Sequence, residues 1–191
     1  MSVSSRIKHF ALATVYIFVA FRTPLYAAQV PKATEYEVKA AYLYNFGKFV
    51  NWPSTGSAGG QDDFVICVLG QDPFGGGLQT SVVGERVGGK PVIAKHIANT
   101  EDGSHCRIIF ISASEQSRVK QVLMDFAQSG ALTVSDMPDF TARGGMIQFV
   151  MRDNKVRFEV NLTAAERARL NLSSELLKVA VSVRRDQERE N

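Results

Sequence analysis

The chain has 191 residues, 45% of them hydrophobic, and a formal net charge of +3, which suits one domain of ordinary size. The positive excess lies in residues 1–27, which hold three of the 22 basic residues and none of the 19 acidic ones. The remaining chain is therefore neutral, and this disfavours nucleic acid as a partner, because phosphate binding needs a surplus of Lys and Arg.

The N-terminal segment, residues 1–27, has the pattern of a cleavable signal peptide. Arg6 and Lys8 precede an apolar stretch that ends at Phe21, and small residues follow at Ala27 and Ala28. Cleavage is expected after Ala27, with Ala28 as the alternative. The apolar stretch is far shorter than the roughly 20 residues that span a bilayer. The sequence thus predicts a protein of the periplasm that does not insert in the membrane after processing.

Cys67 and Cys106 are the only two cysteines. An oxidising compartment favours a disulfide between them, and their spacing excludes a CxxC redox motif. Closing such a loop stabilises a fold by about 4 kcal/mol in the chain-entropy description. The alternative is a pair of buried free thiols.

A helix is predicted over residues 33–51, because apolar residues recur there at spacings of three and four. Its expected buried positions are Tyr36, Ala40, Leu43, Phe46 or Gly47, and Val50. Pro53 is expected to end this helix, and the small residues at 54–60 predict a loop. The unbroken apolar run at 64–69 then predicts a strand buried on both faces.

Helix and strand patterns alternate after this strand. Asp72 and Pro73 predict the start of a helix that covers residues 74–83. A strand at 86–96, interrupted at Gly88 and Gly89, and a buried strand at 107–111 are expected next. Ser112 or Ser114 is expected to cap a helix whose apolar face has four members, and a short strand at 131–134 follows Gly130. Those four members are Val119, Val122, Leu123 and Phe126.

The pattern from Met146 to Val160 predicts a β-hairpin with a two-residue turn at Asp153-Asn154. This turn fixes the register. One face is then wholly apolar, with the pairs Met151 and Val156, Phe149 and Phe158, and Ile147 and Val160. The other face carries Arg152 with Lys155, Val150 with Arg157, and Gln148 with Glu159. One face of the hairpin is predicted to pack in the core, and the other is predicted to face solvent or a partner.

The C-terminal part predicts two helices. Asn161 or Thr163 is expected to cap one that runs through Leu170, and Ser173 or Ser174 starts another. Leu176, Leu177, Ala180, Val181 and Val183 would form the buried stripe of the second. The predicted fold is therefore a single α/β domain at residues 33–183, with a mixed sheet that has a parallel core, a C-terminal hairpin and helices on both faces. A charged tail at 184–191 follows.

No catalytic constellation is visible, and the chain is interpreted as a non-enzyme without a cofactor. The glycine-rich segment 70–77 lacks the spacing of known phosphate-binding loops, so a plain strand-to-helix turn is favoured over an anion site. His96 and His105 match no zinc spacing with the two cysteines. Asp136 and Asp139 flank a proline in an expected loop, and turn formation explains them more simply than acid-base chemistry.

Aromatic residues are densest in the first helix and just after it. Core packing is the default explanation for them, but they spread over more than one helical stripe. Some are therefore expected to line a pocket or a dimer contact. The series comprises Tyr36, Tyr42, Tyr44, Phe46, Phe49 and Trp52.

Two stretches of the chain are distinctive: YEVKAAYLYNFGKFVNWP at residues 36–53 and GGMIQFVMRDNKVRFEVNLTAAERARLNLSSELLKVA at residues 144–180. Together they resemble the YfiR family of periplasmic repressor proteins. The resemblance implies a protein that binds the periplasmic domain of an inner-membrane diguanylate cyclase and holds it inactive, which lowers cyclic di-GMP and biofilm formation. It also implies homodimers, and release of repression by redox or envelope stress or by capture on an outer-membrane lipoprotein.

The cysteines both agree with this family and depart from it. Cys67 and Cys106 stand where the family has a disulfide, in agreement with the argument from the compartment. Well-known members have a second cysteine pair near the start of the hairpin, but residues 141–148 contain none. Redox sensing through a second pair is therefore in doubt.

The outward face of the hairpin is the candidate surface for the partner. It carries Gln148, Val150, Arg157 and Glu159, a mixed polar and apolar set opposite a clean core face. A solvated or helix-covered surface is the alternative explanation. A periplasmic small-molecule binder that uses the glycine-rich segment or an aromatic pocket is the second hypothesis for function. A thiol oxidoreductase is disfavoured, because the CxxC motif is missing.

Overall fold

Two unbroken apolar strands form the centre of the protein. The computed structural model describes residues 33–52 and 63–185. In it, β2 (Phe64–Leu69) and β5 (Ile108–Ile111) are buried at every position and pair in parallel, with Ile66 opposite Ile108. Strands without a polar face must be covered on both sides. This requirement sets the layered arrangement of the other elements.

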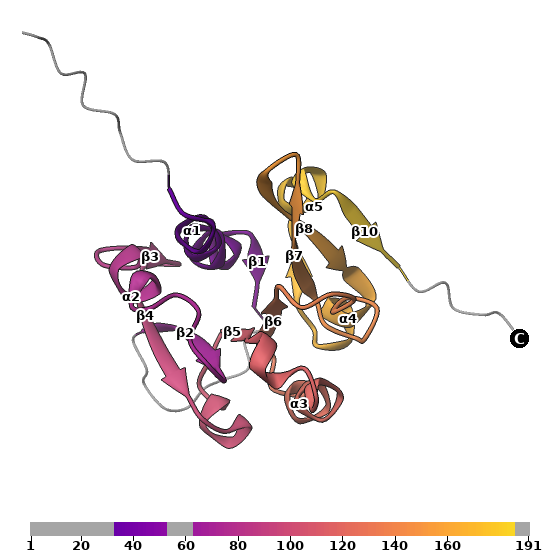
Figure 1. Ribbon diagram of the computed structural model, residues 1–191, viewed down its shortest axis with the longest axis horizontal. Coiled ribbons are helices and arrows are strands. Elements are labelled where there is room, and N and C mark those ends of the chain that lie inside the picture. The colour runs from indigo at the N-terminus through magenta and orange to yellow at the C-terminus, as the bar shows by residue number, and fades with distance from the viewer. Residues whose placement is uncertain (1–32, 53–62, 186–191) are drawn as a thin grey trace, which may run out of the picture. The chain divides into compact units, whose positions relative to one another are not determined.

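Eight strands make up the main sheet, in the order β10-β8-β7-β6-β5-β2-β4-β3 (Figure 1). Neighbours are parallel except in the pairs β7 with β8 and β3 with β4. The predicted mixed sheet with a parallel core is therefore confirmed. The outer strands are β3 (Arg86–Val87), β4 (Lys90–Ile97), β6 (Leu132–Ser135), β7 (Ile147–Arg152), β8 (Lys155–Asn161) and β10 (Ser182–Arg184).

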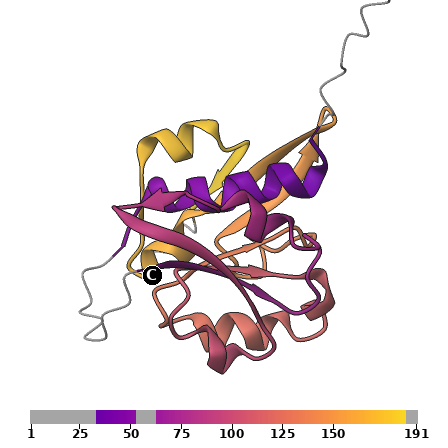
Figure 2. The same ribbon diagram turned by 90° about the vertical axis from the view of Figure 1, so that its left-hand side faces the viewer.

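Helices cover both faces of the sheet, as predicted. Alternate side chains of β2 and β5 enter two separate cores, because successive residues of a strand point to opposite faces. The first core also contains side chains of α1 (Glu35–Lys48), α2 (Gly77–Ser81), α4 (Leu162–Arg167) and α5 (Ser174–Val179). The second contains those of α3 (Val119–Phe126). Figure 2 shows α1 and α3 on opposite sides of the central strands.

Helix α1 begins with a capping box. The Thr34 hydroxyl accepts a hydrogen bond from the Glu37 N–H at 3.3 Å, and the Glu37 carboxylate accepts one from the Thr34 N–H at 2.6 Å. The helix ends at Lys48, so the predicted continuation to residue 51 is wrong. Val50 instead pairs with Leu172, in the small antiparallel sheet of β1 (Val50–Asn51) and β9 (Asn171–Leu172). Pro53 and the loop expected at 54–60 lie outside the described residues.

The hairpin has the predicted register. Phe149 lies opposite Phe158, and all six pairs of β7 with β8 match the expectation. Asp153 and Asn154 both have positive φ, 51° and 57°, as a turn of this kind requires. One expectation on the apolar face is wrong, because Met151 is 50% exposed. It lies near the tip of the hairpin, where the core does not reach.

Left-handed glycines explain two further corrections. The Asp72 carboxylate accepts a hydrogen bond from the Phe74 N–H at 2.8 Å, but α2 starts only at Gly77 and ends at Ser81. Gly75 and Gly76 have φ values of 55° and 84°, which a right-handed helix excludes. Gly88 and Gly89 likewise have positive φ, and they turn the chain back, so that the strand expected at 86–96 is the antiparallel pair β3–β4.

Helix α3 and the strand after it are displaced by a few residues from their predicted positions. Ser112 caps a short 3-10 helix, Ala113–Glu115, and α3 itself begins at Val119. Val119, Val122 and Phe126 are buried as expected, while Leu123 is partly exposed. Strand β6 ends at Ser135, one residue beyond the expected end.

The C-terminal region also differs in part. Asn161 caps α4 and Ser173 caps α5, both predicted choices, but α4 ends at Arg167 rather than at Leu170. Arg169 has φ 61°, which breaks the helix. Val181 and Val183 lie beyond α5 and are not in its buried stripe; Val183 belongs to β10, which pairs in parallel with β8. Strand β10 reaches residue 184, and 186–191 lie outside the described residues.

The expected signal peptide, residues 1–27, lies outside the described residues as well. Across 33–52 and 63–185, no helix has both the length and the apolar character needed to cross a bilayer.

A disulfide joins Cys67 of β2 to Cys106, which lies just before β5. Their Cα atoms are 5.8 Å apart, within the ordinary range. Both residues are buried in the second core, beneath α3. The bridge therefore fastens two central strands together on the face that α3 covers.

We predict that the double substitution Cys67→Ala/Cys106→Ala lowers the free energy of unfolding by about 4 kcal/mol, because the unfolded chain gains the entropy of an open loop. Urea unfolding followed by circular dichroism measures this change. A reducing agent should destabilise the wild-type protein and leave the double variant unaffected. Equal stability of the oxidised wild type and the variant would contradict a structural role for the bridge.

Candidate functional site

Three parallel strands deliver polar residues to one edge of the sheet. Gln71 and Asp72 follow β2, Ser112 follows β5, and Asp136 follows β6. The connection that follows β2 leads to β4, whereas the one that follows β5 leads to β6 in the opposite direction across the sheet. Side chains at the carboxyl ends of such strands surround a crevice, which is the usual ligand position in open α/β sheets.

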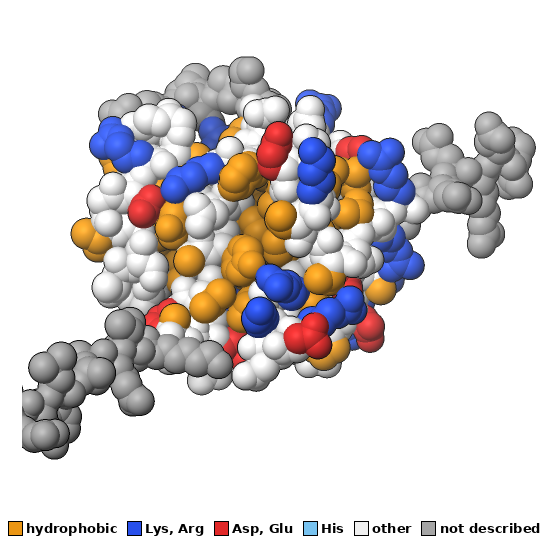
Figure 3. Space-filling model, turned by 90° about the horizontal axis from the view of Figure 1, so that it is seen from above, with side chains coloured by type: hydrophobic (Ala, Val, Ile, Leu, Met, Phe, Trp, Pro, Cys, Tyr) orange, Lys and Arg blue, Asp and Glu red, His pale blue; other side chains and the backbone are white. Residues whose placement is uncertain are grey.

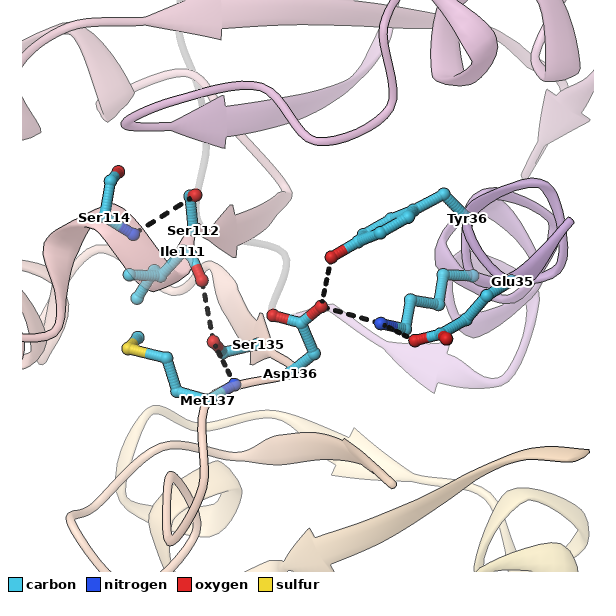
Figure 4. A network of polar contacts seen from close by, with 9 residues as sticks. Glu35, Tyr36, Ile111, Ser112, Ser114, Ser135, Asp136 and Met137 are labelled. Atoms are coloured by element: carbon cyan, nitrogen blue, oxygen red, sulfur yellow. Dashed lines mark hydrogen bonds and ion pairs between the residues drawn. The ribbon is translucent and has the colours of Figure 1, made fainter. Parts of the chain in front are cut away.

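Asp136 is the centre of a polar network at this edge. Its Oδ2 atom accepts a hydrogen bond from the Tyr36 hydroxyl at 2.9 Å and another from the Lys39 Nζ atom at 2.6 Å. Lys39 also forms an ion pair with Glu35, one helical turn earlier, at 2.5 Å. Figure 4 shows that Tyr36 reaches from α1 toward the Asp136 carboxylate, to which Lys39 of the same helix also bonds. The network therefore ties α1 to the end of β6.

Ser135 fixes the backbone that presents Asp136. It is fully buried, its hydroxyl donates to the Ile111 carbonyl oxygen at 2.7 Å, and it accepts a hydrogen bond from the Met137 N–H at 3.1 Å. These bonds hold the end of β6 against the end of β5 (Figure 4). These bonds thus fix the backbone from which the Asp136 side chain extends, without any contact from α1.

Burial and hydrogen bonding act in opposite directions on Lys39. Loss of solvent would lower the pKa of its ammonium, but hydrogen bonds to Asp136 and Glu35 outweigh this and raise the pKa above the ordinary lysine value. Desolvation, followed by the hydrogen bond to Asp136, raises the pKa of the Tyr36 hydroxyl. Lys39 therefore remains charged and Tyr36 remains protonated at neutral pH.

A cleft of about 270 Å³ opens beside this network. It is bounded by α1 and by the segments that follow β2, β5 and β6. Its lining consists of Tyr36, Gln71, Asp72, Pro73, Ser112, Ala113, Ser114 and Asp136.

The segment after β2 forms one wall of the cleft. Gly70 has φ 86°, and a Cβ atom there would lie only 2.4 Å from the Ser114 Oγ atom, so glycine is required by both conformation and space. That Oγ atom accepts a hydrogen bond from the Gln71 N–H at 2.9 Å. The wall presents carboxyl, amide and hydroxyl groups and no cationic side chain. This composition does not favour an anion site at residues 70–77.

The candidate partner surface on the hairpin is partly covered. Gln148 is only 8% exposed, and its side-chain oxygen accepts a hydrogen bond from the Thr141 N–H at 3.3 Å. Val150, Arg157 and Glu159 are half-buried and remain accessible. A second cleft, of about 390 Å³, borders this face at Gln148 and Glu159.

The histidines do not form a site with the two cysteines. His96 forms a hydrogen bond of 2.6 Å with the Gly70 carbonyl oxygen, while Cys67 and Cys106 are bonded to each other. Within the described ranges, no three or more His, Cys, Asp or Glu side chains are grouped in a way that would hold a metal ion.

Sequence reasoning placed Asp136 in a turn and did not connect it with Tyr36 and Lys39. The available signal was its position two residues after the short strand predicted at 131–134, where carboxyl ends of parallel strands meet. The expectation that some aromatic residues of the first helix line a pocket is confirmed for Tyr36. Tyr42 and Phe46 instead pack against Phe149 and Phe158.

A sequence profile described as YfiR/HmsC-like matches residues 36–181. Among solved structures, a conserved domain protein from Vibrio cholerae is similar over 63% of this chain and 54% of its own, with 12% identity and a TM-score of 0.47. The ABC domain from Streptococcus pneumonia in complex with L-Trp is similar over 63% and 55%, with 11% identity and a TM-score of 0.49. The chain thus spans about half the length of these proteins.

We predict that Asp136→Asn lowers the free energy of unfolding by about 3 kcal/mol, because it removes a counter-charge from the buried Lys39 ammonium. The double variant Lys39→Met/Asp136→Asn should recover most of this loss. Asp139→Asn is the matched control: Asp139 is exposed and asparagine tolerates its positive φ, so we expect a change within about 0.5 kcal/mol. Equal effects at residues 136 and 139 would contradict the network.

We also predict a loss of stability at alkaline pH. The pKa values of Lys39 and Tyr36 are both raised in the folded state. Their contribution is therefore complete below the unfolded values, about 10.4 and 10, and is lost as pH rises through the folded values. Urea unfolding should show a steeper decline above about pH 10 for the wild type than for Tyr36→Phe/Lys39→Met. If the free energies of unfolding of the wild type and the variant declined in parallel with rising pH, the network would not be the source of the alkaline loss of stability.

Proposed function

Because the chain belongs to the YfiR/HmsC-like family, we propose that it is a regulator of the periplasm that binds the periplasmic domain of an inner-membrane diguanylate cyclase and represses it. Repression lowers cytoplasmic cyclic di-GMP and with it biofilm formation. The family match over residues 36–181 is the observation that carries this proposal. The family is regulatory rather than catalytic, and the signal-peptide pattern of residues 1–27 supports export.

The two stretches that carry the resemblance form one structural unit. Helix α1 packs on the hairpin β7–β8 through an aromatic cluster, in which the ring of Phe46 lies 5.1 Å from that of Phe158 and 5.8 Å from that of Phe149. Tyr42 contacts both phenylalanines as well. The family signature therefore describes a helix-on-hairpin unit, and this unit holds the outward hairpin face in a fixed position.

We assign the partner surface to that outward face. Val150, Arg157 and Glu159 are accessible, and they combine an apolar contact with both signs of charge, which gives an interface specificity. Gln148 is too buried to contribute much contact of its own, but it fixes the loop at Thr141. Figure 3 shows one face with apolar side chains at its middle and both basic and acidic side chains around them, an arrangement that suits docking.

Repression requires that the protein bind the inactive cyclase more tightly than the active one, because equal affinity for both states shifts no equilibrium. A hundredfold preference corresponds to about 2.7 kcal/mol. Half-buried residues on a rigid hairpin suit this task, since they lose little freedom on binding. Homodimers and release by capture on an outer-membrane lipoprotein, which the resemblance also implies, complete the proposal.

The burial of the disulfide supports a structural role for this bridge and not a redox function. Cys67 is fully buried and Cys106 is 5% exposed, so a thiol cannot easily approach the bridge. Residues 141–148 contain no second pair. Neither a thiol oxidoreductase nor redox sensing through a second disulfide is therefore part of the proposal.

We predict that Glu159→Lys weakens binding to the cyclase's periplasmic domain at least tenfold, because it reverses a charge on the proposed surface. Isothermal titration calorimetry measures the affinity, and circular dichroism verifies the fold. Glu101→Lys is the matched control, because Glu101 is exposed in the 3-10 helix Thr100–Gly103, outside the hairpin. Unchanged affinity of a folded Glu159→Lys protein would remove this residue from the interface.

A further inference from the structure

We infer that the cleft at the carboxyl ends of β2, β5 and β6 binds a small solute that carries a protonated amine. This site is separate from the proposed partner surface, since none of its lining residues belongs to the hairpin. The inference rests on three observations: the position of the cleft in the sheet, the charges that surround it, and the polar atoms that face it unpaired.

The position follows from the strand order. The parallel strands run β4-β2-β5-β6-β7 across the sheet, and the chain goes from β2 toward β4 but from β5 toward β6, in the opposite direction. The loops after β2 and β5 consequently diverge, one toward each face, and leave a crevice between them. The cleft lies between these loops, with Asp72 on one and Ser112 on the other, and α1 closes it through Tyr36.

The surrounding charges favour a cation. Among the described residues, the cleft is lined by two carboxylates, Asp72 and Asp136, and by no Lys, Arg or His side chain. The ammonium of Lys39 is 4% exposed and lies behind the cleft, where it is shared between Asp136 and Glu35. The positive charge of Lys39 is thus outnumbered by the three negative charges of Asp72, Asp136 and Glu35. A guest with a positive charge would restore the balance.

The unpaired atoms specify hydrogen-bond donors on the guest. Oδ2 of Asp136 takes the bonds from Tyr36 and Lys39, whereas Oδ1 accepts none from the described residues and points away from α1 (Figure 4). Oδ1 of Asp72 accepts from the Phe74 N–H, which leaves its second oxygen for a guest. An ammonium group with three N–H donors satisfies such acceptors.

A metal ion fits this site less well. The described residues hold no cluster of three or more potential ligating side chains, and only two carboxylates line the cleft. The hydroxyls of Ser112 and Ser114 each accept a backbone N–H and keep their own hydrogen to donate. They suit an acceptor group elsewhere on an organic solute. At about 270 Å³ the cleft lies just below the range of drug-sized pockets, roughly 300–1,000 Å³, and so takes a small molecule.

Titration of the mature protein with putrescine tests the inference without any cyclase, so its outcome is independent of the proposed function. Isothermal titration calorimetry at physiological ionic strength should give a Kd below about 1 mM. Adipate and Mg²⁺ are the comparison solutes and should not compete. Amide chemical shifts should change at residues 71, 72, 112–114 and 136.

Asp72→Asn is the decisive variant. Its side-chain oxygen can still accept from the Phe74 N–H, so the turn is retained while one charge is lost. Binding of putrescine should weaken at least fivefold, whereas Asp102→Asn, at an exposed position outside the cleft, should leave it unchanged. The inference is overturned if the wild type does not bind amines, if Asp72→Asn binds equally well, if Mg²⁺ or adipate binds instead, or if shift changes map elsewhere.

Discussion

The ion pair of Lys39 with Asp136 is the interaction on which the arrangement of this protein most depends. It fixes the first helix at the carboxyl end of β6, and every other role of α1 follows from that position. From there, α1 covers the first core, brings Phe46 against Phe158, and closes the polar cleft with Tyr36. A hydrophobic contact would tolerate sliding of the helix along the sheet, whereas a buried ammonium with one carboxylate at 2.6 Å and another at 2.5 Å holds one position.

The proposed partner surface and the inferred ligand cleft lie on neighbouring strands. Ser135 of β6 pairs with Gln148 of β7, and Asp136 follows Ser135 directly. Gln148 in turn pairs with Glu159 across the hairpin. The backbone pairing of β6 with β7 and of β7 with β8 therefore connects the cleft to the outward face of the hairpin. Because the strands are buried and Ser135 is bonded to β5, the two surfaces belong to one stiff element and not to separate mobile loops.

The hairpin and the two central strands could be predicted from sequence because their signals are local. A two-residue turn between alternating residues leaves a single register, and an unbroken apolar run leaves no solvent face. The network could not be predicted in this way, since residues 36 and 136 meet only after the sheet has formed. The start of α2 was missed for another reason: Asp72 has the chemistry of a cap, but Gly75 and Gly76 adopt left-handed conformations that favour a turn. The exposure of Met151 could not be predicted, because alternating apolar residues indicate which face of a strand is buried but not how far along the hairpin the core extends.

The central claim is that this chain, once exported, represses a diguanylate cyclase. Cytoplasmic cyclic di-GMP measured by mass spectrometry in a strain that lacks the chain tests it most directly. We expect cyclic di-GMP to rise on deletion and to return to its original level with the full chain, but not with a version that lacks residues 1–27. An unchanged level after deletion, or full restoration by the version without residues 1–27, would contradict it.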